Sequence, residues 1–311
     1  MTHQNGLTQQ FEEHRPRLRG VAYRMLGSLS EAEDAVQEAW LRLNRTDASS
    51  VDNLGAWLTT VVSRVCLDML RSRKARREEP IAPAFSERGV ARGQGADPER
   101  EAVLADAVGV ALLVVLNTLT PSERLAFVLH DLFGLPFEEI GSILGRSRDA
   151  AKQLASRARR RVRGSPSTPA AGLAQQRALV EAFMNAVRNG DLQGLLAVLD
   201  PEAVLHIDAA ARADGAVGRV DAPPSEIGQP RELKGAAAWA PQLIAMSRML
   251  RFVQQALIDG SVGVILAPGG TLVRALTFDL VHGRIARVDA IGDPVRLREL
   301  DIAMLREETH G

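Results

Sequence analysis

A run of polar and basic side chains between residues 148 and 160 has the composition and spacing of a nucleic-acid contact surface. Its members are Arg148, Asp149, Lys152, Gln153, Ser156, Arg157 and Arg160. Most of them recur at steps of three or four residues, so a helix would put them on one face, opposite a stripe of small and apolar residues. Such side chains can hydrogen-bond base edges in a major groove or phosphate oxygens beside it. The pattern therefore predicts a helix that reads duplex DNA.

The residues before this run predict the elements that position it. A capping box with proline at the first helical position, Thr120-Pro121-Ser122-Glu123, predicts a helix that runs to about Phe133. An amphipathic segment over residues 137–144 predicts the next helix; Gly145 can end it in the left-handed conformation and Ser147 can cap the helix that follows. Two helices joined by such a turn are typical of a DNA-binding helix-turn-helix.

Charge is distributed unevenly along the chain. It has 311 residues, enough for two or three domains, and a formal net charge of zero. One basic cluster lies between residues 71 and 77 and another between residues 146 and 163. An arginine-rich helix end is by itself as compatible with a solvated surface as with phosphate binding. The pair of helices just before the second cluster favours duplex binding.

The sequence offers few groups for other chemistry. Cys66 is the single cysteine, which excludes a disulfide and a thiolate metal site. The six histidines show no metal-ligand spacing and there is no glycine-rich phosphate loop, so we expect neither a metal nor any other cofactor. The polar first residues do not resemble a signal peptide, and no apolar run reaches transmembrane length. We therefore expect a cytoplasmic protein that does not contact a membrane.

Hydrophobic periodicity divides the chain into three blocks. Residues 8–77 read as helices, with a capping box at Ser30 and Glu33 for the second helix and a start near Asp52 or Asn53 for the third. Segments rich in Pro, Gly, Ser and Ala or in charge predict two flexible joints. The expected organisation is a domain over 1–77, a linker over 78–100, a domain over 101–164 that opens with a helix from Glu101 to Leu116, a linker over 165–172, and a third domain over 173–311.

The third block changes character from helical to mixed. Five runs read as strands, and the turns Asp259-Gly260, Pro268-Gly269-Gly270 and His282-Gly283 imply antiparallel hairpins. The expected strands are 203–208, 249–258, 261–267, 271–281 and 284–291, flanked by helices over 173–188, 235–248 and 294–308. The predicted fold class is multidomain: two all-α domains followed by an α+β domain with a curved antiparallel sheet.

The order of these blocks resembles the bacterial extracytoplasmic-function (ECF) sigma factors, which are specificity subunits of RNA polymerase. The resemblance covers roughly the first half of the chain. SEAEDAVQEAWLRL, residues 30–43, is similar to the family's polymerase-binding helix. SERLAFVLHDLFGLPFEEIGSILGRS, residues 122–147, is similar to its helix-turn-helix, the reader of the minus-thirty-five element. The first block would then be sigma domain 2 and the second sigma domain 4.

This resemblance implies roles for three sets of residues. The polymerase-binding face would be Asp34, Gln37 and Glu38, which otherwise read as an ordinary exposed helix surface. Residues 53–77 are similar to the minus-ten helix, and the loop over 46–53 would capture a flipped base. The minus-ten set would be Asp52, Asn53, Arg64, Asp68, Arg71 and Arg73. The minus-thirty-five set would be the run named at the outset, from Arg148 to Arg160.

The last domain resembles the SnoaL-like cone, an extension that a subgroup of sigma factors carries. Stand-alone cones can be enzymes that place an Asp and a His in an apolar pocket, and His206 and Asp208 alternate along one expected strand here. We regard them as a candidate pocket with a structural histidine rather than as catalytic residues. Two segments depart from relatives: Asp208-Ala209-Ala210-Ala211 replaces Asp-Gly-Gly-Gly, and residues 292–297 replace Asn-Pro-Asp-Lys-Leu.

The sequence thus predicts a transcription initiation factor and not an enzyme. Its expected partners are bacterial core RNA polymerase and promoter DNA, with intramolecular contact between the C-terminal domain and the sigma domains. That contact would modulate activity in cis and make a separate anti-sigma factor unnecessary. Two alternatives stay open: a helix-turn-helix regulator that binds an operator without polymerase, and a SnoaL-type enzyme fused to a DNA-binding region.

Overall fold

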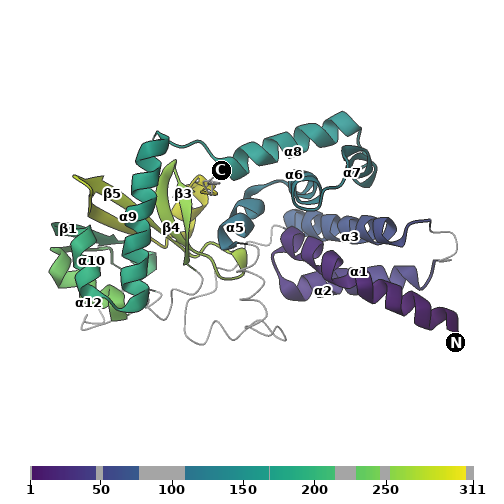
Figure 1. Cartoon of the computed structure of the whole chain (residues 1–311), viewed down its shortest axis with the longest axis horizontal. Coiled ribbons are helices and arrows are strands. Elements are labelled where there is room, and N and C mark those ends of the chain that lie inside the picture. The colour runs from purple at the N-terminus through teal and green to yellow at the C-terminus, as the bar shows by residue number, and fades with distance from the viewer. Residues whose placement is uncertain are drawn as a thin grey trace. The chain divides into compact units, whose positions relative to one another are not determined.

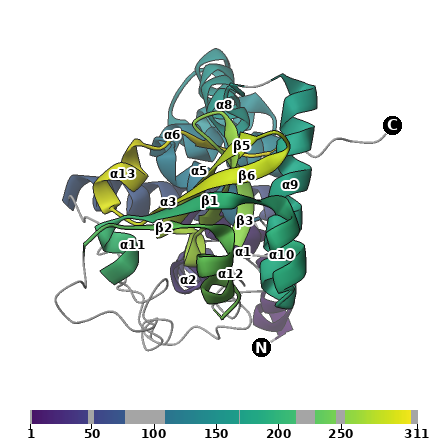
Figure 2. The same ribbon diagram turned by 90° about the vertical axis from the view of Figure 1, so that its left-hand side faces the viewer.

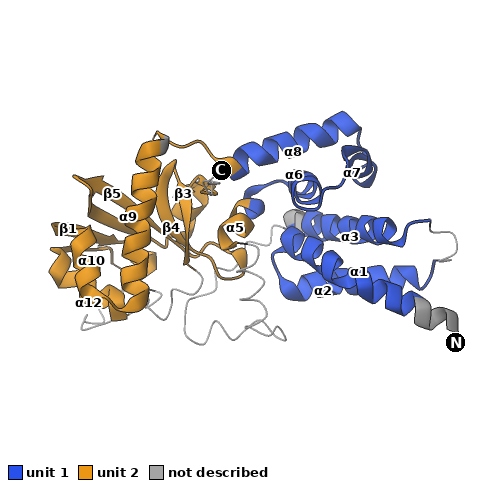
Figure 3. Cartoon of the chain, viewed as in Figure 1, with its two compact units in different colours: residues 1–80, 95–104, 116–162 blue, residues 81–94, 105–115, 163–311 orange. Residues whose placement is uncertain are grey.

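The structure, a computed structural model, divides the chain into two compact units (Figure 3). It describes residues 2–46, 52–76, 109–167, 169–213, 229–245 and 253–305. Unit 1 comprises residues 1–80, 95–104 and 116–162, and unit 2 comprises residues 81–94, 105–115 and 163–311. The two helical blocks that the sequence separates therefore cluster in one unit. The expected linker over 78–100, most of the base-capturing loop and the start of the expected helix 101–116 lie outside the described residues.

The first block is a bundle of three helices (Figure 1), α1 (Thr2–Leu26), α2 (Leu29–Leu43) and α3 (Leu54–Arg76). The expected capping box at Ser30 and Glu33 is wrong, because Ser28 is the N-cap of α2 and its Oγ accepts a hydrogen bond from the Glu31 amide at 3.4 Å. The expected start of α3 is confirmed: the Asn53 side chain accepts a hydrogen bond from the Ala56 amide at 3.0 Å.

The second block holds α5 (Val110–Thr118), α6 (Pro121–Phe127), the π-helix η3 (Val128–Leu132), α7 (Phe137–Leu144) and α8 (Arg148–Arg163). The capping box at Thr120 and Glu123 is present. Gly145 ends α7 with φ 64, and the Ser147 hydroxyl caps α8 by accepting from the Ala150 amide at 3.2 Å. The helix-turn-helix signals are therefore confirmed; the widening of α6 into a π-helix was not predicted.

Unit 2 contains a seven-stranded sheet in the order β2-β1-β6-β5-β4-β3-β7 (Figure 2). The strands are β1 (Leu199–Ile207), β2 (Arg231–Lys234), β3 (Val253–Ile258), β4 (Ser261–Leu266), β5 (Arg274–Val281), β6 (Arg284–Ile291) and β7 (Ile302–Ala303). Positive φ at both central residues of the β3–β4 and β5–β6 turns confirms the two tight hairpins.

Three expectations for this unit are corrected. The sheet is mixed rather than antiparallel throughout, because β1 and β6 pair in parallel. The expected helix over 294–308 is only the short α13 (Pro294–Glu299), and the chain then adds β7 beside β3. The edge strand β2 was not predicted at all. Both missed strands are short and pair with partners distant in sequence.

One face of the sheet is covered by helices of its own unit. These are α9 (Ala170–Asn189), α10 (Leu192–Val198) and α12 (Ala236–Ala245), and the short α11 (Ala209–Ala213) follows β1 (Figure 2). Alternate residues of β1, such as Leu205 and Ile207, point into this core. Trp239 of α12 is fully buried, and its indole N–H donates to the Ala203 carbonyl at 3.0 Å.

The opposite face receives the first part of α5, which belongs to unit 2 up to residue 115. Gln254 lies on this face because its neighbour Gln255 bonds to α9, and the Gln254 side chain accepts from the Ala111 amide at 3.0 Å. A Cβ on Gly270 would lie 2.7 Å from the Cβ of Leu113, so glycine is required for this approach. Every residue of α5 from Val110 to Leu116 is buried. An entirely apolar stretch of helix is therefore removed from water, and it contacts the sheet side at Ala111 and Leu113.

Candidate nucleic-acid interface

Helix α8 presents the predicted set on one exposed face. Its opposite stripe, Ala151, Leu154, Ala155, Ala158 and Val162, is buried as expected. Five members of the set are exposed and make no hydrogen bond or ion pair within the described part of the chain: Lys152, Gln153, Ser156, Arg157 and Arg160. Asp149 is also exposed, at the first turn. Arg148 pairs with Glu138 of α7 at 2.8 Å, but both side chains are more than half exposed, so the pair is weak.

The other arginines near the end of α8 have structural partners. Arg159 pairs with Asp131 of η3 at 2.5 Å, and the Arg161 guanidinium donates to the Thr118 carbonyl at 3.2 Å. These contacts fix α8 against the preceding helices of unit 1. The arginine run therefore divides into residues that hold the helix-turn-helix together and residues free to bind phosphate.

On α2, Asp34 and Gln37 are exposed, and the Glu38 carboxylate accepts from Arg42 at 2.9 Å with both side chains about half exposed. The sequence pattern missed one member of this surface. Leu41 follows Asp34, Gln37 and Glu38 at helical spacing and is 41% exposed, which is high for a large apolar side chain. It could have been identified as a leucine out of phase with the buried stripe of α2.

The expected minus-ten set separates on α3. Arg64, Asp68 and Arg71 lie at helical spacing and are exposed, and Asp68 and Arg71 approach to 3.8 Å. Asp52 and Asn53 are exposed at the amino end of the helix. Arg73 differs from them. Its guanidinium forms an ion pair with Glu31 of α2 and donates to the Leu26 carbonyl at 3.3 Å, so it ties α3 to the other two helices of the bundle.

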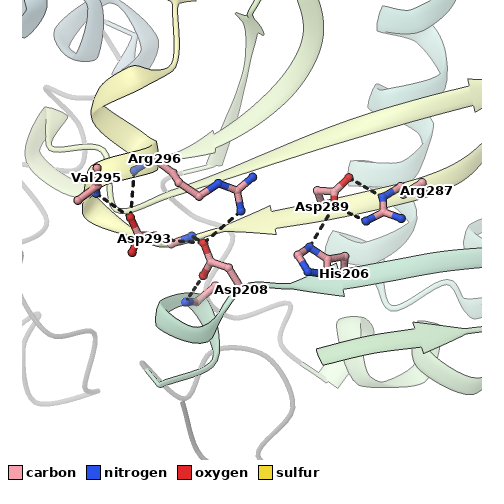
Figure 4. A network of polar contacts seen from close by, with 9 residues as sticks. His206, Asp208, Arg287, Asp289, Asp293, Val295 and Arg296 are labelled. Carbon is pink, nitrogen blue, oxygen red and sulfur yellow. Dashed lines mark hydrogen bonds and ion pairs between the residues drawn. The ribbon is translucent and has the colours of Figure 1, made fainter. Parts of the chain in front are cut away.

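In unit 2 the structure gives His206 and Asp208 different partners (Figure 4). His206 Nδ1 lies 3.1 Å from Asp289 Oδ1, and Arg287 binds the same carboxylate through two hydrogen bonds of 2.9 and 3.0 Å. Asp289 raises the pKa of Arg287 above its usual value through this bonding. This network lies on the sheet face opposite to the core helices, because Leu205 and Ile207 of β1 occupy the core side.

Asp208 follows the end of β1 and is buried. Its carboxylate accepts from the backbone amides of Ala211, Gly292 and Asp293 at 2.6, 2.8 and 2.9 Å. The two segments that depart from the resembled subgroup, at 208–211 and 292–297, therefore meet at this side chain. Asp208 acts as a brace between loops, and among the described residues it makes no direct contact with His206. Asp208 lies one position beyond the end of β1, and a pocket formed by His206 and Asp208 stays a prediction.

Two family descriptions match the helical part of the chain. Residues 10–76 match sigma-70 region 2 and residues 109–162 match sigma-70 region 4. These ranges hold the three-helix bundle and the helix-turn-helix, so the fold and the exposed surfaces define a protein of the sigma-70 class. None of the helices described in the structure combines the length and the apolar character needed to cross a bilayer.

Curated relatives narrow the class. The chain is 41% identical over 209 residues to the probable ECF RNA polymerase sigma factor SigI of Mycobacterium tuberculosis, covering 67% of this chain and 72% of that protein. It is 42% identical over 217 residues to the ECF RNA polymerase sigma factor SigJ of the same species, covering 68% of each. The crystal structure of SigJ aligns over 94% of this chain and 98% of that chain with 29% identity and a TM-score of 0.43. The chain belongs to the ECF sigma factor family.

The different settings of Arg73 and Arg71 lead to a prediction. Arg73→Ala removes a half-buried ion pair within the helical bundle, so we expect it to lower the free energy of unfolding by about 1–2 kcal/mol. Arg71→Ala, the control, removes a mostly exposed side chain and should change that free energy by less than about 0.5 kcal/mol. Urea denaturation followed by circular dichroism measures both; equal losses would contradict the structural role of Arg73.

Proposed function

We propose that this chain initiates promoter-specific transcription by bringing core RNA polymerase to promoter DNA. The observation that carries the proposal is the face of α8, where five polar or basic side chains lie exposed in a region-4 fold and have no partner among the residues that the structure describes. Such a helix fits the major groove with its first turns at the base edges. Lys152 and Arg157 would neutralise phosphates, and Gln153 and Ser156 would bond base edges.

We further propose that α2 binds the polymerase through Asp34, Gln37, Glu38 and Leu41. A half-exposed leucine beside acidic and amide groups offers apolar area to a partner within a polar rim. The minus-ten element would contact Arg64, Asp68 and Arg71 on α3 and Asp52 and Asn53 at its amino end. Binding free energy from these contacts would drive strand separation, so no covalent step is required of the chain.

The C-terminal domain would act in cis through α5. Region 4 of the family match begins at residue 109, so the helix segment that lies on the sheet of unit 2 is also the first helix of region 4. A domain that covers part of a promoter-reading region within one chain would take the place of a separate anti-sigma factor. Support for this comes from the Ala111–Gln254 hydrogen bond and from the close approach of Leu113 to Gly270.

Contacts of α8 with phosphate are tested by the dependence of DNA affinity on salt. Lys152→Ala and Arg157→Ala should each weaken binding to all duplexes and reduce the slope of log K against log salt by about 1. Arg161→Ala, which removes an internal hydrogen bond, is the control and should leave the slope unchanged. Fluorescence anisotropy over a range of salt concentrations measures the slope, and unchanged slopes for both first variants would remove α8 from the interface.

The operator-binding alternative is tested by polymerase binding. The triple variant Asp34→Ala, Gln37→Ala, Glu38→Ala should lose at least about tenfold in affinity for core polymerase, and Leu41→Ala about threefold or more, because contacts at the centre of an interface dominate its free energy. DNA binding by α8 should not change. Biolayer interferometry with purified core polymerase gives the affinities, and run-off transcription gives the activity. A chain that binds DNA as a dimer on two half-sites but never binds polymerase would favour the operator regulator.

Regulation in cis is tested from both sides of the α5 contact. Leu113→Asp and Gly270→Val both disrupt the packing of α5 on the sheet, so both should change run-off transcription in the same direction as truncation after Gly164, by about threefold or more. Leu132→Asp places the same charge at an exposed leucine and is the matched control. Opposite effects of Leu113→Asp and Gly270→Val would show that this contact is not the route of regulation.

A further inference from the structure

Arg124 is a buried cation where region 4 packs on region 2 inside unit 1. Helices α6 and α7 contact α3, and η3 contacts α1. Arg124 of α6 is 3% exposed. Its Nε donates to the Arg24 carbonyl in the last turn of α1 at 2.9 Å, and its Nη1 donates to Asn117 Oδ1 at 2.7 Å. Nη2 is buried and has no acceptor among the described residues.

No ionised acceptor binds Arg124 within the described residues, although the buried Cys66 thiol nearby favours its charge slightly. Within the described part of the chain, its hydrogen bonds reach the Arg24 carbonyl and the Asn117 amide oxygen, neither of which is ionised. Burial, assisted by repulsion from Arg73, lowers the pKa of Arg124 to about 9. A guanidinium keeps its proton in proteins, so the desolvation of the charge opposes the packed arrangement. We call this set of contacts between region 2 and region 4 the closed joint.

Two arginines of α1 also contact the turn after η3 in the closed joint. The Arg17 guanidinium donates to the Phe133 carbonyl at 3.2 Å, and the guanidinium carbons of Arg17 and Arg24 lie 5.9 and 5.4 Å from the centre of the Phe133 ring. Beside them is a cavity of about 330 Å³ whose lining includes Asn53, Gly55, Phe133 and Pro136. The turn after η3 thus stands next to the amino end of the minus-ten helix.

A closed unit 1 is too small to read both promoter elements. The minus-ten and minus-thirty-five elements are about 25 base pairs apart, which is about 85 Å of duplex at 3.4 Å per pair. A compact unit of about 140 residues has a radius of gyration of about 14 Å and is therefore roughly 40 Å across. The closed joint must separate before α3 and α8 can occupy their elements together.

We infer that Arg124 keeps the closed joint metastable, so that binding of polymerase and promoter can open it and place the guanidinium in water. This inference rests on the proposed function, because it assigns Arg124 a role in the step between free protein and initiation complex. Apolar contacts between the two regions favour the closed joint, and the buried charge of Arg124 lowers the free energy that stabilises it. Hydration of Arg124 on opening then offsets part of the lost packing.

The experiment measures the separation of the two regions directly. Nitroxide labels on Glu13→Cys of α1 and Ser142→Cys of α7, both exposed positions, in a Cys66→Ala background report their distance by double electron–electron resonance. The free protein should show one short distance. Addition of core polymerase and a promoter duplex should produce a population tens of ångströms longer. If the distance stays short in the full complex, the closed unit is the working form and the inference is wrong.

Arg124→Met keeps an unbranched side chain and removes its charge. We expect it to raise the melting temperature of the free protein, to retain a short-distance population with polymerase and promoter, and to lower run-off transcription about threefold or more. Arg124→Gln, which keeps a donor without the charge, should shift the same way. Arg159→Met is the control, because it breaks an ion pair that lies wholly within region 4 and should not change the distances.

Two outcomes separate this inference from the proposed function. The inference fails if Arg124→Met and Arg124→Gln both have melting temperatures no higher than that of the unaltered protein and separate as readily with polymerase and promoter. In that case the charge does not destabilise the closed joint, but transcription by the unaltered chain still supports the proposed function. The proposed function fails if the unaltered chain directs no transcription. The melting temperatures and the distances in the free protein then still show whether the charge destabilises the closed joint.

Discussion

The burial of α5 is the constraint on which the arrangement of this chain depends. All residues of α5 from Val110 to Leu116 are apolar, so no side of this stretch is suited to solvent exposure. Helix α8 differs, because its polar and apolar residues lie on opposite sides. Burial of each such side chain is worth about 1.5–3 kcal/mol. Ala111 and Leu113 contact the sheet side of unit 2 at Gln254 and Gly270, and Leu116 is buried in unit 1. The first residues of region 4, up to residue 115, thus cluster with unit 2.

Charge has a different function in each element of unit 1. On α8, the side chains of Lys152, Arg157 and Arg160 are exposed to solvent. Two other arginines of the same helix, Arg159 and Arg161, contact residues within the fold. Arg73 holds the bundle together through Glu31. Arg124 is the exception, since it is buried and none of its hydrogen-bond partners in the described part of the chain is an anion. Unpaired buried cations oppose folding, so a position that keeps one is a candidate for conformational change.

The sequence predicted what local signals determine and missed what distant contacts determine. The capping box at Thr120, the end of α7 at Gly145 and the two tight hairpins each depend on residues within a few positions. The parallel pairing of β1 with β6 joins strands about eighty residues apart, and the residues of local turns do not determine which distant strands pair. Arg64 and Arg73 look alike in sequence; only the position of Glu31 on another helix separates their roles. Ser28 caps α2 because Gly27, with φ 75, redirects the chain just before it, and the pattern at Ser30 could not reveal that.

The brace at Asp208 shows why a departure in sequence need not be a departure in structure. Its three acceptor contacts are to backbone amides, which alanine supplies as well as glycine does, so the Ala209-Ala210-Ala211 segment leaves the hydrogen bonds intact. Gly292 is different, because a Cβ there would lie 2.6 Å from the backbone of Ala211. The joint between the end of β1 and the end of β6 therefore depends on the Asp208 carboxylate and the small size of residue 292, and it tolerates change in the residues between.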